Sequence, residues 1–282
     1  MKRIIKNVVA IIALGIVFVS CSSNDVSTPV PDELAGITKF KEVLNDTHTI
    51  ELYSHMTLEQ GYNEIKIRIK DNATNNYVKD AEVSWTPLMH MSTMTHSCPK
   101  SVVEKISPNG TLYEGYLVFQ MAQNDSEYWD LKIDYRINGT SYTATTTIDV
   151  PVSSERRVNT FTGSDGEKYI VAYAEPHHPK VAVNDIVVGI FKMQDMMHFQ
   201  VVDGYSLKID PRMPSMGNHG SPNNVTAIQQ TAGGLYTGKM ALTMTGYWKI
   251  NLQLVKPDGT VVKGESITDT VTESSLYFDF EF

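Results

Sequence analysis

The chain repeats itself, and this self-similarity limits what it can fold into. Four short motifs recur in the same order, displaced by 119 to 124 positions. A period this long is typical of two tandem domains, because solenoid repeats are only about 20–50 residues long. We therefore expect domains at residues 46–150 and 168–282, joined by a linker at 151–167. The matched motifs are 85–87 with 209–211, 96–99 with 219–222, 112–115 with 235–238, and 128–131 with 247–250.

Each copy has the sequence pattern of a β-sheet domain. Residues 65–69 alternate apolar and polar side chains, which is the period of a half-buried strand. Turn-forming pairs such as Asn138-Gly139 separate segments of this kind. Many short strands within about 100 residues favour a β-sandwich. We therefore predict an all-β fold of two tandem Ig-like β-sandwich domains, with Trp129 and Trp248 in their cores.

The first residues have the pattern of an export signal. Basic residues precede an apolar run at 8–19, which is too short to span a bilayer, since about 20 residues are needed. Residues 18–21 (FVSC) resemble a lipobox, in which the cysteine is acylated. We therefore predict a signal peptide at 1–20, lipidation at Cys21, a tether at 21–45, and anchoring in the cell envelope on either side of the outer membrane. The alternatives are an ordinary secretory signal and an uncleaved anchor.

Net charge argues against one class of partner, and the cysteine count limits the disulfides that the chain can form. The formal net charge of −8 becomes −11 once residues 1–20, which hold three basic and no acidic residues, are removed. This balance argues against nucleic-acid binding, which requires a basic surface. The two cysteines are Cys21 and Cys98. Acylation of the first leaves Cys98 as an unpaired, reactive thiol with no intrachain disulfide.

Residues 87–99 are enriched in side chains that bind soft metal ions. Three methionines, two histidines and one cysteine fall within ten residues, and the second copy carries a similar set at 213–219. Thioether sulfur favours Cu(I), whereas imidazole suits both copper and zinc. We therefore predict copper, as Cu(I), held by loops at the edge of each sandwich. The candidate ligands are Met213, Met216, His219, Met89, Met91, Met94 and His96, with His90 and Cys98 as additional candidates.

Further histidines stand at matching positions before the first strand of each copy. His55 and the pair His177-His178 are additional candidate ligands, and residues 196–198 (MMH) form a third Met/His cluster in the second copy. Methionine commonly fills cores, so Met89 or Met213 taken alone would be interpreted as packing inward. Clustering among small polar residues, and recurrence in both copies, favours metal binding instead.

The second copy resembles the YtkA-like domain, an Ig-like family of exported bacterial proteins. The likeness rests on the P-x-M…M-x-x-H-x-S-P run at 211–222 and on Tyr236, Gly238, Tyr247 and Trp248. It extends over about residues 51–150 and 168–271. The resemblance implies an Ig-like fold and copper ligands in both copies, namely Met213, Met216 and His219, and Met94 and His96 with Met89 or Met91. The first copy departs from the pattern because it lacks the Met-Gly-Asn-His order and adds His90, Met91 and Cys98.

The sequence predicts a binding protein rather than an enzyme. It contains no nucleophile elbow, glycine-rich phosphate loop, His-Glu-x-x-His helix or EF-hand loop. We expect a copper-binding envelope lipoprotein that sequesters copper or delivers it to a copper enzyme or exporter. The alternative is a structural or adhesive Ig-like lipoprotein that docks a protein partner without metal, with its methionines forming an adaptable surface.

Overall fold

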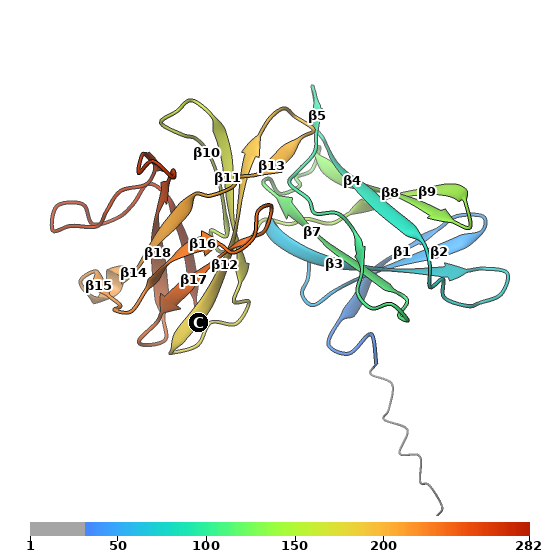
Figure 1. Ribbon diagram of the computed structural model, residues 1–282, viewed down its shortest axis with the longest axis horizontal. Helices are drawn as coiled ribbons and strands as arrows, with labels where there is room; N and C mark the ends of the chain where they lie inside the picture. The colour runs from blue at the N-terminus through green and yellow to red at the C-terminus, as the bar shows by residue number, and fades with distance from the viewer. Residues whose placement is uncertain (1–31) are drawn as a thin grey trace, which may run out of the picture. The chain divides into compact units, whose positions relative to one another are not determined.

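The computed structural model describes residues 32–282, whose arrangement is shown in Figure 1. The predicted signal peptide and Cys21 lie outside these residues. Residues Glu33–Phe282 form one compact unit that is built from strands and contains one short 3-10 helix. The predicted all-β fold is confirmed. No helix within this part of the chain is long and apolar enough to cross a bilayer.

Strands follow one another along the whole described chain, and their pairs run antiparallel. The first nine are β1 (Thr38–Leu44), β2 (His48–Ser54), β3 (Gly61–Asp71), β4 (Glu82–His90), β5 (Thr95–His96), β6 (Glu104–Lys105), β7 (Leu112–Phe119), β8 (Tyr128–Ile137) and β9 (Thr140–Ile148). The remaining elements are β10 (Val158–Thr162), β11 (Lys168–Glu175), β12 (Val183–Met193), β13 (Phe199–Val201), β14 (Ser206–Met213), η1 (Pro214–Met216), β15 (His219–Gly220), β16 (Val225–Gln229), β17 (Tyr236–Ala241), β18 (Tyr247–Val255), β19 (Val261–Lys263) and β20 (Tyr277–Glu281).

Strands β1 to β9 form two sheets around a common core. The five-stranded sheet has the order β1-β2-β3-β7-β6, and the four-stranded sheet has the order β5-β4-β8-β9. Burial alternates along β3 with Ile65, Ile67 and Ile69 inside, as the alternation of apolar and polar residues predicts. These side chains belong to one core with Trp129 and Leu131 of the other sheet. Two sheets that share a core in this way are typical of a β-sandwich.

Strands β10 to β20 enclose a second core. Hydrogen bonds connect them in the order β10-β11-β12-β17-β16-β14-β18-β19, with β13, β15 and β20 attached at the side. The core contains Trp248, Ile186 and Phe278, and it shares no residue with the first core. The division into two Ig-like domains stays a prediction.

Residues matched by the repeat make matching contacts in the two halves. The hydroxyl of buried Tyr113 donates to a backbone carbonyl at 2.8 Å and accepts from a backbone N–H. Tyr236 does the same, with its carbonyl partner at 2.6 Å. The indoles of Trp129 and Trp248 each donate to a methionine carbonyl at 3.0 Å. Because buried Tyr and Trp need partners for their polar atoms, the sequence repeat corresponds to shared structural roles.

Two stretches that the sequence assigns to connecting segments contain strands. Residues 38–44, placed in the tether, form β1, and residues 158–162, placed in the linker, form β10. Each has a single buried side chain, Val43 and Asn159 respectively, so neither shows the alternation that predicts a strand. Backbone pairing with β2 and β11 holds these strands in place.

A third hydrophobic cluster lies where the two halves of the unit meet. It comprises Val118 from β7 together with Ile170, Ala172 and Phe191 from β11 and β12. The rings of Tyr116 and Phe191 lie 6.2 Å apart, centroid to centroid. The two halves therefore bury apolar surface against each other.

Glycine at one position of the repeat lets two chain segments approach closely. A Cβ atom at Gly115 would lie 2.7 Å from the ring of Trp85, and one at Gly238 would lie 2.6 Å from the carbonyl oxygen of Val225. Because interiors are close-packed, a methyl group at either site requires its neighbours to move.

We predict that Gly115→Ala and Gly238→Ala each lower the free energy of unfolding by about 1–3 kcal/mol, the usual cost of overpacking. Chemical denaturation measures this value. Thr145→Ala, on the exposed side of β9, is the control and should change the value by less than about 0.5 kcal/mol. Unchanged stability of the glycine variants would contradict the close approach.

Cys98 belongs to the first core, where 1% of its surface is exposed. Burial raises the pKa of its thiol, so the reactive thiolate does not form at neutral pH. The expectation of a reactive thiol is therefore wrong for the folded chain. Cys98 packs as a small apolar side chain, as buried free cysteines generally do.

We predict that a protein lacking residues 1–21 shows no reaction of Cys98 with an aromatic disulfide reagent while it is folded. After denaturation one thiol per chain should react, which absorbance measures directly. A Cys98→Ala variant gives the baseline. Rapid labelling of the folded protein would place the thiol at the surface.

Candidate metal centre

The segment predicted as a Met/His loop in the first copy is largely a β-hairpin. Met89 belongs to β4 and His96 to β5, so only residues 91–94 form the turn. The Met91 N–H closes this turn by donating to the Met94 carbonyl at 2.9 Å. Met89 and His96 are paired across the two strands, which places their side chains on one face of the sheet. Met89 is fully buried in the core, which corrects its expected place on an exposed loop.

His96 is held so that one ring nitrogen remains free. The imidazole is 5% exposed and meets the edge of Trp129 at 5.5 Å between ring centroids. Its Nδ1 lies 2.7 Å from the carbonyl oxygen of Ser97, so we assign the proton to Nδ1. Nε2 is buried and has no hydrogen-bond partner. In this tautomer Nε2 carries a free lone pair, which is the form that binds metal ions.

Two further orphaned polar atoms accompany this nitrogen. Ser97 Oγ and Gln120 Oε1 are also buried without partners. The Gln120 amide nitrogen donates to the Ser97 carbonyl at 3.0 Å and lies 3.3 Å from His96 Nδ1, so the three residues are in contact. Buried polar atoms normally have partners, and each orphan costs about 1–3 kcal/mol. The three orphaned atoms therefore belong to residues that contact one another, and buried polar atoms of this kind are satisfied by ordered water, an ion or a polar ligand.

The remaining candidates of the first copy belong to the same hairpin. His90 stacks on Tyr128 with 4.8 Å between ring centroids. Its Nε2 lies 3.0 Å from an Asp130 carboxylate oxygen, but without hydrogen-bond alignment, so this nitrogen is also unpartnered. Met91 is half-buried against the core, and Met94 is 48% exposed. The hairpin thus carries both thioether and imidazole groups, whereas the Cys98 thiol is buried in the first core.

The second copy places its candidate ligands differently. Met213 ends β14 and is 3% exposed within the second core, which corrects its expected place on a loop. Met216 is 57% exposed in η1, and His219 is exposed in β15 opposite Met213. A methionine that packs into the core and a histidine that faces solvent do not form an open ligand set.

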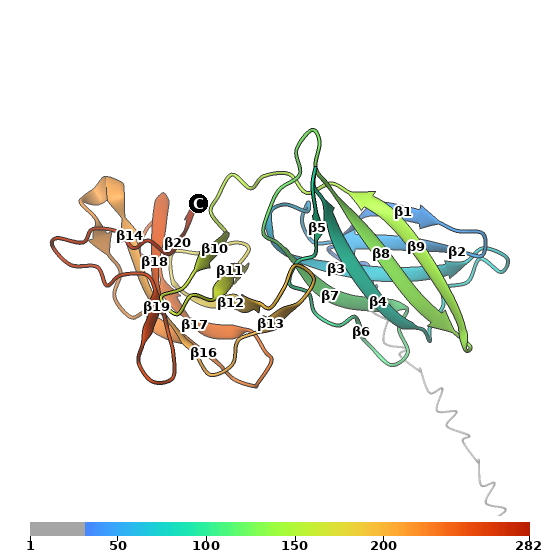
Figure 2. The same ribbon diagram turned by 90° about the horizontal axis from the view of Figure 1, so that it is seen from above.

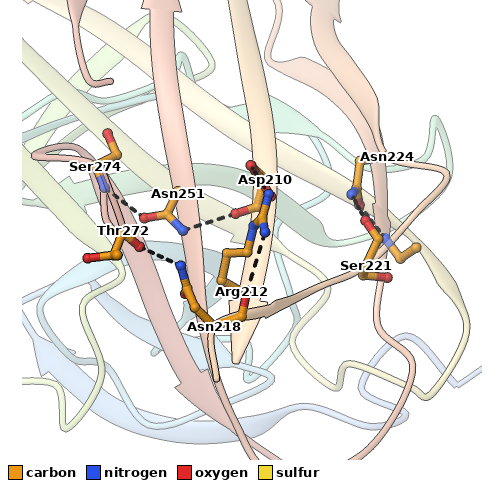
Figure 3. A network of polar contacts seen from close by, with 9 residues as sticks. Asp210, Arg212, Asn218, Ser221, Asn224, Asn251, Thr272 and Ser274 are labelled. Atoms are coloured by element: carbon orange, nitrogen blue, oxygen red, sulfur yellow. Dashed lines mark hydrogen bonds and ion pairs between the residues drawn. The ribbon is translucent and has the colours of Figure 1, made fainter. Parts of the chain in front are cut away.

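A polar network holds the second-copy loop, as Figure 3 shows. Arg212 donates twice to Asp210, at 2.7 and 2.9 Å, and also donates to the Asn218 carbonyl. The Asn218 amide donates to the Thr272 carbonyl at 2.9 Å. These bonds fix the loop without using Met216.

The additional histidines lie elsewhere. His55 and His177 line one cavity, together with Glu64. His55 Nε2 is 3.8 Å from a Glu64 oxygen, and His177 Nε2 is 3.3 Å from a Glu175 oxygen. His178 is exposed. No group of three His, Cys, Asp or Glu residues in the described chain is arranged to hold a metal ion.

The structure brings the third Met/His cluster to the first hairpin. The backbone N–H of Ser97 donates to the carbonyl of Met196 at 2.8 Å. Met196, Met197 and His198 form the tip of the β12–β13 hairpin, which lies beside β5 in Figures 1 and 2. The sequence identifies this cluster by composition, but no local pattern predicts its contact with residues about 100 positions earlier.

Comparisons with known proteins give no family. No protein-family model and no curated protein sequence matches the chain. The solved structure of a DUF4785 family protein from Legionella pneumophila matches 77% of this chain, with 9% sequence identity and a TM-score of 0.26. The match covers about half, 54%, of the length of that protein. A chimeric titin Z1Z2 tandem shares 12% identity over 80% of this chain and 95% of its own, with a TM-score of 0.17. Neither likeness bears on function, and the resemblance to the YtkA-like domain stays a prediction.

Proposed function

We propose that the protein binds copper as Cu(I) at the β4–β5 hairpin, with Nε2 of His96 as the nitrogen ligand. The observation that carries this proposal is the buried, unpartnered Nε2. Its ring is oriented by the bond from Nδ1 to a backbone carbonyl, the type of outer contact that metal-binding histidines usually make. In this role the protein sequesters copper in the cell envelope or delivers it to a copper enzyme or exporter.

The surrounding side chains favour a soft, monovalent ion. Met91 and Met94 lie at the two ends of the turn and offer neutral thioether sulfur, which prefers Cu(I). Hard ions such as Ca²⁺ and Mg²⁺ need several oxygen ligands, and this hairpin does not gather carboxylates. Because thioethers have no proton to lose, they bind Cu(I) without competition from protons.

Copper binding in this proposal is concentrated in the first half of the chain. His219, which the sequence repeat matches to His96, is exposed, and its register partner Met213 lies in the core. His219 therefore lacks the enclosed surroundings of His96. This difference between two matched histidines provides an internal control.

We predict that His96→Gln weakens Cu(I) binding by at least about tenfold. Loss of an outer contact alone usually lowers metal affinity by about 10–100-fold, and loss of a direct ligand should lower it at least as much. His219→Gln should leave affinity within about twofold of the wild type. Competition against a chromophoric Cu(I) chelator measures both, and thermal unfolding checks that each variant folds.

A ligand that binds the native state must also stabilise it, by about 2.7 kcal/mol at a free concentration one hundred times the Kd. Cu(I) should therefore raise the Tm of the wild-type chain. Absence of both binding and a Tm shift would refute the copper proposal and favour the docking of a protein partner through the same methionines.

A further inference from the structure

We propose that the β12–β13 hairpin supplies the second half of this site, so that one Cu(I) ion is held between the two halves of the chain. The inference rests on the proposed copper binding and deepens it. It assigns His198 and the neighbouring thioethers of Met196 and Met197 as ligands. These residues belong to neither of the two matched Met/His segments.

A hydrogen bond from the backbone N–H of Ser97, the residue that follows His96, joins the two hairpins. The Ser97 carbonyl fixes His96, and the Ser97 N–H donates to Met196 at 2.8 Å. The backbone of the Met196 hairpin is thus hydrogen-bonded to the residue adjacent to His96. At the base of the same hairpin, Phe199 and Val201 pack against the hydrophobic cluster shared by both halves.

The tip of the β12–β13 hairpin is a rigid turn. The His198 carbonyl accepts the Gln194 N–H at 2.9 Å, which closes the turn. One carboxylate oxygen of Asp195 accepts the backbone N–H groups of Met197 and His198 at 2.7 and 2.9 Å. The backbone of the turn is therefore fixed before any ligand arrives.

His198 is oriented in the same way as His96. Its Nδ1 lies 2.8 Å from an Asp195 carboxylate oxygen, so the proton sits on Nδ1 and Nε2 keeps its lone pair. A carboxylate that accepts from the second ring nitrogen is one of the usual arrangements behind a metal-binding histidine. The side chain is 70% exposed, so Nε2 is accessible to an incoming ion.

Thioether groups from both hairpins are exposed in this region. Met196 is 36% exposed, Met197 is 38% exposed, and Met94 on the facing hairpin is 48% exposed. Thioethers and imidazoles together supply the mixed sulfur and nitrogen ligands that Cu(I) prefers. The net formal charge of −8 also favours a cation near the surface.

The test compares two exposed histidines of the second half in the full mature chain. His198→Ala should weaken Cu(I) binding by at least about tenfold. X-ray absorption of the bound copper should show two nitrogen neighbours in the wild type and one in this variant. His178→Ala is the matched control and should change neither value. Met196→Ala with Met197→Ala should lower the sulfur contribution.

The outcomes separate this inference from the proposal beneath it. If His198→Ala binds Cu(I) like the wild type while His96→Gln does not, the site is confined to the first half and the bridging inference is overturned. If the wild type itself fails to bind Cu(I), both are overturned. Since His198 lies at an exposed turn, its removal should leave the Tm of the metal-free chain unchanged, which separates ligand loss from misfolding.

Discussion

The candidate site depends on two hydrogen bonds made by the backbone of Ser97. Its carbonyl holds the proton of His96 on Nδ1, and its N–H holds the Met196 hairpin. One residue thus contacts both the imidazole of His96 and the hairpin that carries the second group of candidate ligands. Loss of the first contact would leave His96 free to turn, and loss of the second would remove the hydrogen bond that joins the two hairpins.

Regular patterns in the sequence predicted the framework, and exceptions to those patterns were missed. The inward isoleucines of β3 follow from alternation alone, and the repeat predicted matching roles for Trp129 and Trp248. Strands β1 and β10 were missed because backbone pairing, rather than side-chain burial, holds them. Composition cannot reveal pairing of that kind.

The residue types of the candidate site can be read from the sequence, but their burial cannot. Composition singles out the hairpin that carries His96, whereas Met89 and Met213 lie in cores because strands β4 and β14 continue to these residues. The orphaned nitrogen of His96 depends on a single hydrogen bond, and the contact with Met196 joins residues distant in sequence. Neither feature leaves a local signature.

The edge contact between His96 and Trp129 has an optical consequence. The chain has three tryptophans, and all of them are buried. A Cu(I) ion on His96 would lie close to the indole of Trp129 but would not touch Trp248, which belongs to the other core. Indole emission from the first core would therefore report any ligand bound at His96, with Trp248 in the second core as the reference.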